Sequence, residues 1–157
     1  MSLLNVLDSA VAEHEGEPTY FEPLREQSFV EAIPLLRQAM CVEDGQAMGL
    51  YAALLALGHG IEQNLQEAVD WFRQGAVRGD SFSQFSFGVC LTHGLGLPAN
   101  HMEAAYWLFK AGCAGNSKAI SLLSDIAGKN PGVIGPHFSV EAYHDLMTQL
   151  RRPALVH

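Results

Sequence analysis

Basic side chains are scarce in this sequence, and they are almost absent from its first half. The 157 residues include 9 Lys and Arg against 17 Asp and Glu, which gives a formal net charge of −8 at pH 7. Residues 1–70 hold 12 acidic and two basic residues, a net charge of −10, whereas residues 71–157 carry a net charge of +2. Because an acidic surface repels a polyanion, we expect no nucleic-acid partner. The imbalance favours a basic partner or, alternatively, serves only solubility.

Long apolar runs, an export signal and paired cysteines are lacking as well. No apolar run approaches the ~18 residues that are needed to cross a bilayer. The first eight residues contain no basic segment and end in Asp8, which is not the pattern of a secretory signal. The three cysteines (Cys41, Cys90 and Cys113) are odd in number and lie in apolar stretches, as is typical of a reducing compartment. We therefore expect a cytoplasmic protein that has no membrane partner.

An internal repeat of 36 residues runs through the middle of the chain. Residues 45–79 align on residues 81–115 without a gap and share eight identities in 35 positions, whereas composition alone predicts about two. The identical pairs are Leu55 and Leu91, Gly58 and Gly94, Gly60 and Gly96, Asn64 and Asn100, Glu67 and Glu103, Ala68 and Ala104, Trp71 and Trp107, and Gly79 and Gly115.

Each copy has the pattern of two helices joined by a glycine turn. In the first copy, apolar residues at helical spacing predict a helix over residues 46–57. Gly58 ends that helix, because glycine adopts the left-handed cap conformation at little cost. Asn64, with Glu67 three residues later, predicts the start of a second helix over residues 65–78. The second copy repeats the same pattern.

The flanking segments extend and cap this array, since the ends of a stacked array need a polar face. We predict one all-α domain, an αα-solenoid of antiparallel helix pairs with 36-residue repeats and atypical terminal capping helices. Its predicted parts are a capping helix (about 2–14) and acidic linker over 1–28, a degenerate leading half-repeat over 29–44, repeats over 45–80 and 81–116, a divergent third repeat with a closing helix over 117–150, and a tail over 151–157.

The repeated residues resemble the Sel-1-like repeat, a relative of the tetratricopeptide repeat. The matching residues of the first copy are Ala47, Gly58-x-Gly60-Ile61, Ala68-x-x-Trp71, Ala76 and Gly79, and the second copy matches with Gly94-x-Gly96-Leu97, Ala104-x-x-Trp107 and Gly115. The resemblance implies a right-handed superhelix with a concave face that grips protein segments. It also implies kinship with small bacterial adaptors and with immunity proteins that neutralise a cognate toxin.

Patterns for catalysis, cofactors and metals are weak. The glycine turns follow no predicted strand and lack a third glycine, so the helix hairpin explains them better than a dinucleotide loop does. None of the seven histidines forms an i,i+4 pair beside an acidic residue, and there is no Cys-x-x-Cys. Trp71 and Trp107 occupy equivalent positions, which indicates core packing. We expect a non-enzymatic protein with no cofactor and no metal.

The acidic residues before residue 45 are the main candidates for partner binding. A solvated acidic run, a patch that faces a partner and a catalytic carboxylate pair are the three interpretations, and the last needs a cleft that the sequence does not indicate. Positions outside the predicted core stripe of the first helices add candidate groove contacts. The predicted partner-binding residues are Glu13, Glu15, Glu17, Glu22, Glu26, Glu43, Asp44, Met48, Gln84 and Thr92.

Two functional hypotheses follow from these patterns. The first is an immunity protein that holds one basic, cytoplasm-acting toxin, since opposite charges steer association and select the partner. The second is a general adaptor whose concave groove captures segments of several proteins. An enzyme is a third and much weaker interpretation.

Overall fold

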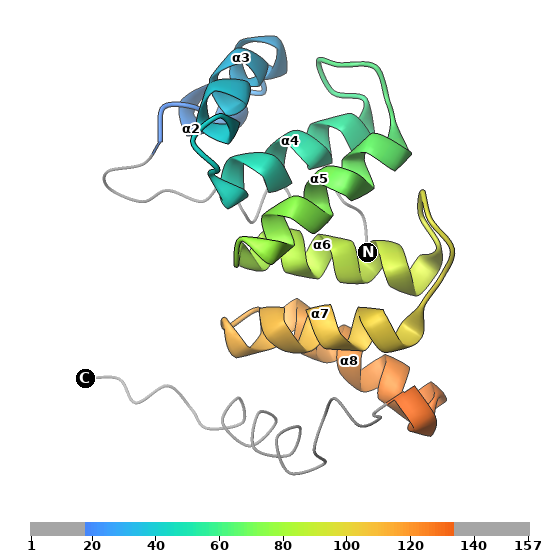
Figure 1. Cartoon of the computed structure of the whole chain (residues 1–157). Helices are drawn as coiled ribbons and strands as arrows, with labels where there is room; N and C mark the ends of the chain where they lie inside the picture. Colours follow the sequence, from blue (N-terminus) through green and yellow to red (C-terminus); the bar gives the residue numbers. More distant parts are fainter. Residues whose placement is uncertain (1–17, 134–157) are drawn as a thin grey trace, which may run out of the picture.

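The structure is a computed structural model that describes residues 18–133, and every regular element in this part of the chain is a helix (Figure 1). The predicted all-α fold is therefore confirmed. The predicted helix over residues 2–14, the chain beyond residue 133 and the tail lie outside the described residues. No helix among the described ones is long and apolar enough to span a membrane. The elements are α2 (Phe21–Arg25), α3 (Phe29–Met40), α4 (Gly45–Leu57), α5 (Leu65–Val77), α6 (Ser81–His93), α7 (His101–Cys113), α8 (Ser117–Lys129) and the 3₁₀ turn η1 (Pro131–Val133).

The helices form antiparallel pairs that stack into a short solenoid. Helix α4 pairs with α5 and α6 pairs with α7, while α5 also contacts α6 and α7 also contacts α8. Helices α4, α6 and α8 contact one another in sequence along one side of the stack. Figure 1 shows the stack beginning at α2 and α3 and ending at α8. The 36-residue period of the sequence is thus one helix pair of the solenoid.

Side-chain caps recur at the same period and mark where each helix begins. Asp44, Asp80 and Asn116, spaced 36 residues apart, accept hydrogen bonds from backbone N–H groups in the first turns of α4, α6 and α8. Asn64 and Asn100 do the same for α5 and α7. An N-cap of this kind stabilises a helix by about 1 kcal/mol because it pairs an otherwise unsatisfied donor. The caps explain why the helix boundaries repeat so closely between the copies.

Small residues let the paired helices approach one another. Gly88 of α6 faces Leu108 of α7, and a Cβ at position 88 would lie 2.8 Å from both Cγ and Cδ2 of Leu108. Ala104, which is fully buried on α7, lies beside the same contact. Larger side chains at positions 88 and 104 would push α6 and α7 apart.

The segment between residues 18 and 28 differs from the predicted acidic linker. It contains the short helix α2, and Tyr20, Phe21 and Leu24 are buried in the core. These three residues have helical spacing, so they pack on one side while the acidic residues of the segment remain in solvent. The prediction of a linker followed the acidic composition of the segment and missed this apolar stripe.

The contact between α6 and α7 leads to a stability prediction. We expect Gly88→Ala to lower the free energy of unfolding by about 1–3 kcal/mol, because the added methyl group overlaps Leu108. Gly128→Ala in α8 is the control, since a Cβ at that position meets nothing within 4 Å. We expect the control to stabilise the protein by about 0.5–1 kcal/mol through helix propensity. Urea unfolding followed by circular dichroism measures both, and equal effects of the two substitutions would contradict the prediction.

Candidate functional site

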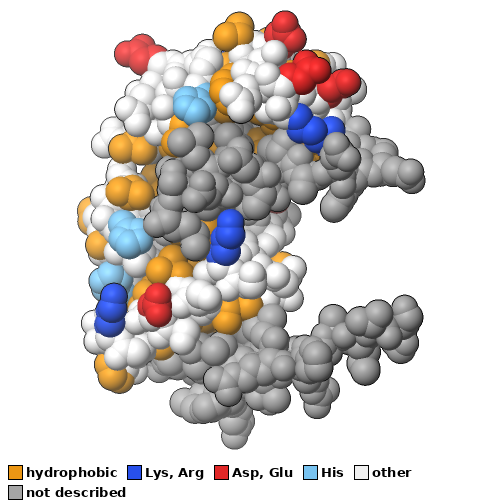
Figure 2. Space-filling model, turned by 180° about the vertical axis from the view of Figure 1, so that it is seen from behind, with side chains coloured by type: hydrophobic (Ala, Val, Ile, Leu, Met, Phe, Trp, Pro, Cys, Tyr) orange, Lys and Arg blue, Asp and Glu red, His pale blue; other side chains and the backbone are white. Residues whose placement is uncertain are grey.

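Acidic side chains gather at the end of the solenoid that α2 and α3 form (Figure 2). Glu22, Glu26 and Glu31 are exposed there, and we call these three residues the acidic end. Helix α2 positions Glu22 and Glu26 because Phe21 and Leu24 hold its opposite side in the core. None of the three carboxylates has a hydrogen-bond or ion-pair partner within residues 18–133. Glu13, Glu15 and Glu17, which we also predicted to bind a partner, lie outside the described residues.

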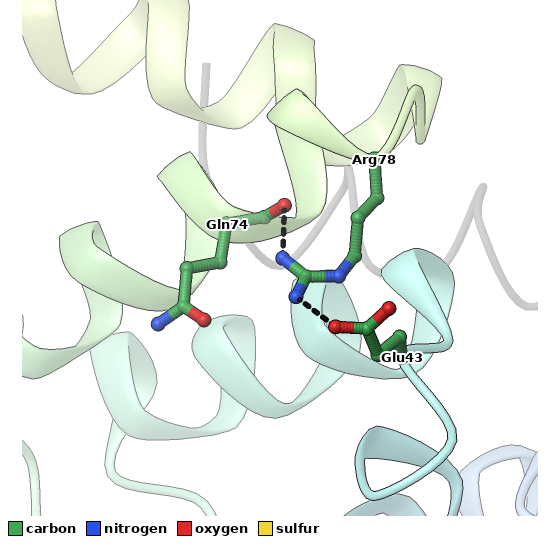
Figure 3. Close-up of polar contacts among 3 residues, drawn as sticks. All are labelled: Glu43, Gln74 and Arg78. Atoms are coloured by element: carbon green, nitrogen blue, oxygen red, sulfur yellow. Dashed lines mark hydrogen bonds and ion pairs between the residues drawn. The ribbon is translucent and has the colours of Figure 1, made fainter.

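Glu43 is held by an ion pair with the first repeat. Its Oε1 lies 3.0 Å from Nη2 of Arg78, and Nη1 of Arg78 donates to the backbone carbonyl of Gln74 (Figure 3). The Glu43 side chain is nevertheless 78% exposed. An exposed pair of this kind contributes little to stability. Glu43 is thus reachable by a partner, but its charge is already partly balanced by Arg78.

Asp44 caps a helix. Its Oδ1 accepts hydrogen bonds from the backbone N–H groups of Gln46 and Ala47, and its Oδ2 accepts one from the hydroxyl of Tyr20 at 2.9 Å. Burial and then this hydrogen bond raise the pKa of Tyr20 above its ordinary value. The geometry therefore gives Asp44 a structural role at the junction of α2 and α4.

The expected positions of Met48 and Gln84 outside the core are wrong. Met48 is 2% exposed and Gln84 is 6% exposed, and Nε2 of Gln84 donates to the backbone carbonyl of Ala76 at 3.2 Å. Ten consecutive residues of α4, 47–56, are buried, so this helix is covered on every side. A sequence signal for this was present, because neither α4 nor the first twelve residues of α6 contain a charged side chain.

Thr92 lines a hollow that sequence reasoning missed. Its hydroxyl donates to the backbone carbonyl of Gly88 at 2.7 Å, and the side chain lies at the edge of a cavity of about 510 Å³ between α6, α7 and α8. Both apolar and polar side chains line it. The apolar lining residues are Val89, Leu122 and Ile126, and the polar and charged ones are Thr92, His93, His101, Lys118, Ser121, Asp125, Lys129 and Asn130.

The described residues do not assemble a metal site, and the one buried thiol among them is unreactive. No group of three or more His, Cys, Asp and Glu side chains within residues 18–133 has a geometry that could hold a metal ion. Cys90 is buried, and burial raises the pKa of its thiol to about 12. A thiol with such a pKa is protonated and unreactive at neutral pH. Trp71 and Trp107 pack against Tyr51 and Phe87, as their equivalent positions predicted.

The comparisons with known proteins agree with this geometry. The model of the Sel1 repeat family matches residues 45–80 and 81–116, the same boundaries as the two repeats. A Sel1 repeat protein from Oxalobacter formigenes has a similar structure, with a TM-score of 0.67 and 25% sequence identity over 71% of this chain and 46% of its own length. No curated protein matches the sequence.

A second solved structure is similar in fold. It is c5321, a protective antigen present in uropathogenic Escherichia coli strains that displays an SLR fold. The TM-score is 0.65 at 18% identity, and the match covers 99% of this chain and 34% of that one. This chain therefore spans about half and about a third of the lengths of the two structures.

Asp80 leads to a prediction about capping and pH. Its Oδ2 accepts hydrogen bonds from N and Oγ of Ser83, and burial raises its pKa despite these bonds. We expect Asp80→Ala to cost about 1–2 kcal/mol of unfolding free energy, because the cap is lost. Asp80→Asn keeps an acceptor and removes a buried charge, so it should be as stable as the parent protein or more stable at pH 7.

The pH dependence of the Asp80→Asn effect has a definite sign. Because the folded-state pKa of Asp80 is raised, the ionised carboxylate costs stability above that pKa, and protonation removes the cost. The advantage of Asp80→Asn over the parent should therefore shrink as pH falls from 7 through the folded-state pKa. Thermal unfolding of both proteins across this pH range measures the difference in stability. A difference that grows toward acid pH would contradict a raised pKa of Asp80.

The three thiols should differ sharply in reactivity. Cys41 and Cys113 are exposed, whereas Cys90 is buried. We expect two thiols to react with Ellman's reagent in the folded protein at pH 8, and the third only after unfolding in guanidinium. Cys90→Ser should leave the folded-state count at two. A folded-state count of three would show that Cys90 is reachable.

Proposed function

Because residues 45–80 and 81–116 are Sel1 repeats, and Sel1 repeat proteins are generally protein-interaction scaffolds, we propose that this protein binds a basic protein through its acidic end. The observation that carries the proposal is the set of exposed carboxylates of Glu22, Glu26 and Glu31 at one end of the solenoid. Glu13, Glu15 and Glu17 extend the same charge in the sequence, and we propose that they take part. The proposal includes no catalytic step and no cofactor.

The arrangement of the carboxylates supports an electrostatic role. They lie at one end of the stack, where Glu22, Glu26, Glu31 and the exposed Glu43 outnumber the two exposed basic residues of α2 and α3, Arg25 and Arg37. A one-sided charge of this kind orients a partner of opposite charge during encounter and raises the association rate more than the affinity. Glu43 adds a further carboxylate nearby, with its charge partly balanced by Arg78.

The finer form of the proposal is an immunity protein that holds one basic, cytoplasm-acting toxin domain in a stoichiometric complex. The net charge of −10 over residues 1–70 supports this form. The alternative is an adaptor that gathers several proteins in the concave groove. The hollow at Thr92, which apolar side chains and side chains of both charges line, favours the alternative.

Charge reversal tests the proposal in the full chain. We expect Glu22→Lys with Glu26→Lys to abolish or strongly reduce capture of the partner from a lysate of the native host. Glu62→Lys with Asp70→Lys is the matched control, since both residues are exposed and the change in charge is the same. A partner that both variants retain would contradict a role for the acidic end.

The captured proteins then distinguish the two forms. An immunity protein should yield one basic partner that stops bacterial growth when expressed alone, and co-expression of the parent chain should restore growth. The Glu22→Lys, Glu26→Lys variant should not restore it, and the association rate of the parent should fall steeply with salt. Several non-toxic partners of unrelated sequence would establish the adaptor instead.

A further inference from the structure

The outer face of α7 differs from that of its counterpart in the first repeat. Met102 and Tyr106 are 50% and 38% exposed, and Lys110 follows them one turn later. Large apolar side chains are thus exposed in a row on one helix. At the matching positions of α5, 36 residues earlier, the side chains are polar: Gln66, Asp70 and Gln74. The difference is confined to the surface, since the buried positions of the two repeats agree.

The same face of α7 contains a shallow hollow. It also carries two charged side chains, Glu103 and Lys110, that are available to a partner. The hollow, about 450 Å³, is lined by Asn100, Met102, Glu103, Tyr106 and Trp107. In the first repeat, Glu67 accepts a hydrogen bond from Nε1 of Trp71 at 3.4 Å. In the second repeat, the carboxylate of Glu103 has no such bond within residues 18–133, and Nε1 of Trp107 is buried without an acceptor.

Lys110 provides the opposite charge at the other end of this face. Its Nζ lies 5.1 Å from the ring centre of Tyr106 and 5.5 Å from that of Trp107, and the two rings meet edge to face at 5.1 Å. Cation–π contacts at an exposed site are weak, so the ammonium group is free to meet a carboxylate. Glu103, Tyr106, Trp107 and Lys110 have the spacing i, i+3, i+4 and i+7, which places them on one stripe.

We propose that this stripe pairs with the same stripe of a second copy of the chain. A twofold axis between residues 106 and 107 places Lys110 of each copy opposite Glu103 of the other, and brings the exposed Tyr106 rings of the two copies to the centre of the contact. A surface that complements itself in this way is what a twofold contact requires. The aliphatic stem of Lys110 would enter the hollow at the start of the opposite α7, with its ammonium group at Glu103. This pairing is independent of the proposed function of the acidic end.

The size of the face makes the contact weak. A helix of 13 residues is about 20 Å long, and one such face buries much less than the ~800 Å² per partner of a standard interface. We therefore expect a dissociation constant on the order of 100 μM. Sedimentation velocity between 10 μM and 1 mM measures it in the full chain. A 17.1 kDa species alone at 1 mM would overturn the proposal.

Charge exchange then tests the pairing geometry. Glu103→Lys and Lys110→Glu should each weaken self-association by about tenfold, because both create like charges across the axis. An equimolar mixture of the two variants should associate at least about tenfold more tightly than either alone, since the opposite charges then face each other again. This gain is independent of folding defects, because misfolded variants do not rescue one another.

The first repeat supplies the matched controls. Glu67→Lys makes the same charge change on α5 as Glu103→Lys makes on α7, and Gln74→Glu places an acidic residue at the position that matches Lys110; both should leave self-association unchanged. The combined exchange Met102→Gln, Tyr106→Asp and Lys110→Gln, which copies the α5 surface onto α7, should abolish self-association without lowering the melting temperature by more than a few degrees. A mixture of the charge variants that associates no better than its components would overturn the pairing.

Discussion

The burial of α4 and of most of α6 is the constraint on which the rest of the structure depends. A helix that is covered on every side cannot contain an unpaired charge. The free energy that is lost when a charge leaves water is far larger than the free energy that a single contact provides. The chain satisfies this with ten consecutive buried residues in α4 and with serine, glutamine and glycine between the aromatic residues of α6. Side chains that are available for binding consequently lie on the second helices of the pairs, in the turns, at the two ends and at the C-terminal end of α6, where Thr92 and His93 line the hollow.

The caps and the small residues are consequences of the same packing. A buried helix needs its first backbone N–H groups satisfied within the protein, which Asp44 and Asp80 accomplish at the starts of α4 and α6. Both carboxylates are thereby committed to structure, even though they belong to the acidic half or border it. The acidic residues that remain for a partner are those whose side chains point away from the stack, such as Glu22 and Glu26.

The two repeats show how one framework carries different surfaces. Their buried positions agree because α4 with α5 and α6 with α7 must pack in the same way. Their outer positions are unconstrained by the core, and there Gln66 and Asp70 are replaced by Met102 and Tyr106. Even the retained Trp–Glu pair differs, since Glu67 accepts a hydrogen bond from Trp71 while Trp107 has no acceptor among residues 18–133. A repeat therefore acquires function at surface positions, where core packing does not constrain the side chain.

The sequence by itself determined the helical class, the 36-residue period and the helix boundaries to within about two residues, because caps, glycine turns and apolar spacing are local signals. Tertiary structure alone decided which of the remaining side chains face solvent. Met48 and Gln84 read as exposed on a single helix, yet neighbouring helices bury them, and an acidic segment conceals the buried Phe21 and Leu24. The spacing of apolar residues in the sequence specifies which residues share one face of a helix. How many faces of that helix are covered depends on the neighbouring helices, and these are known only from the packed structure.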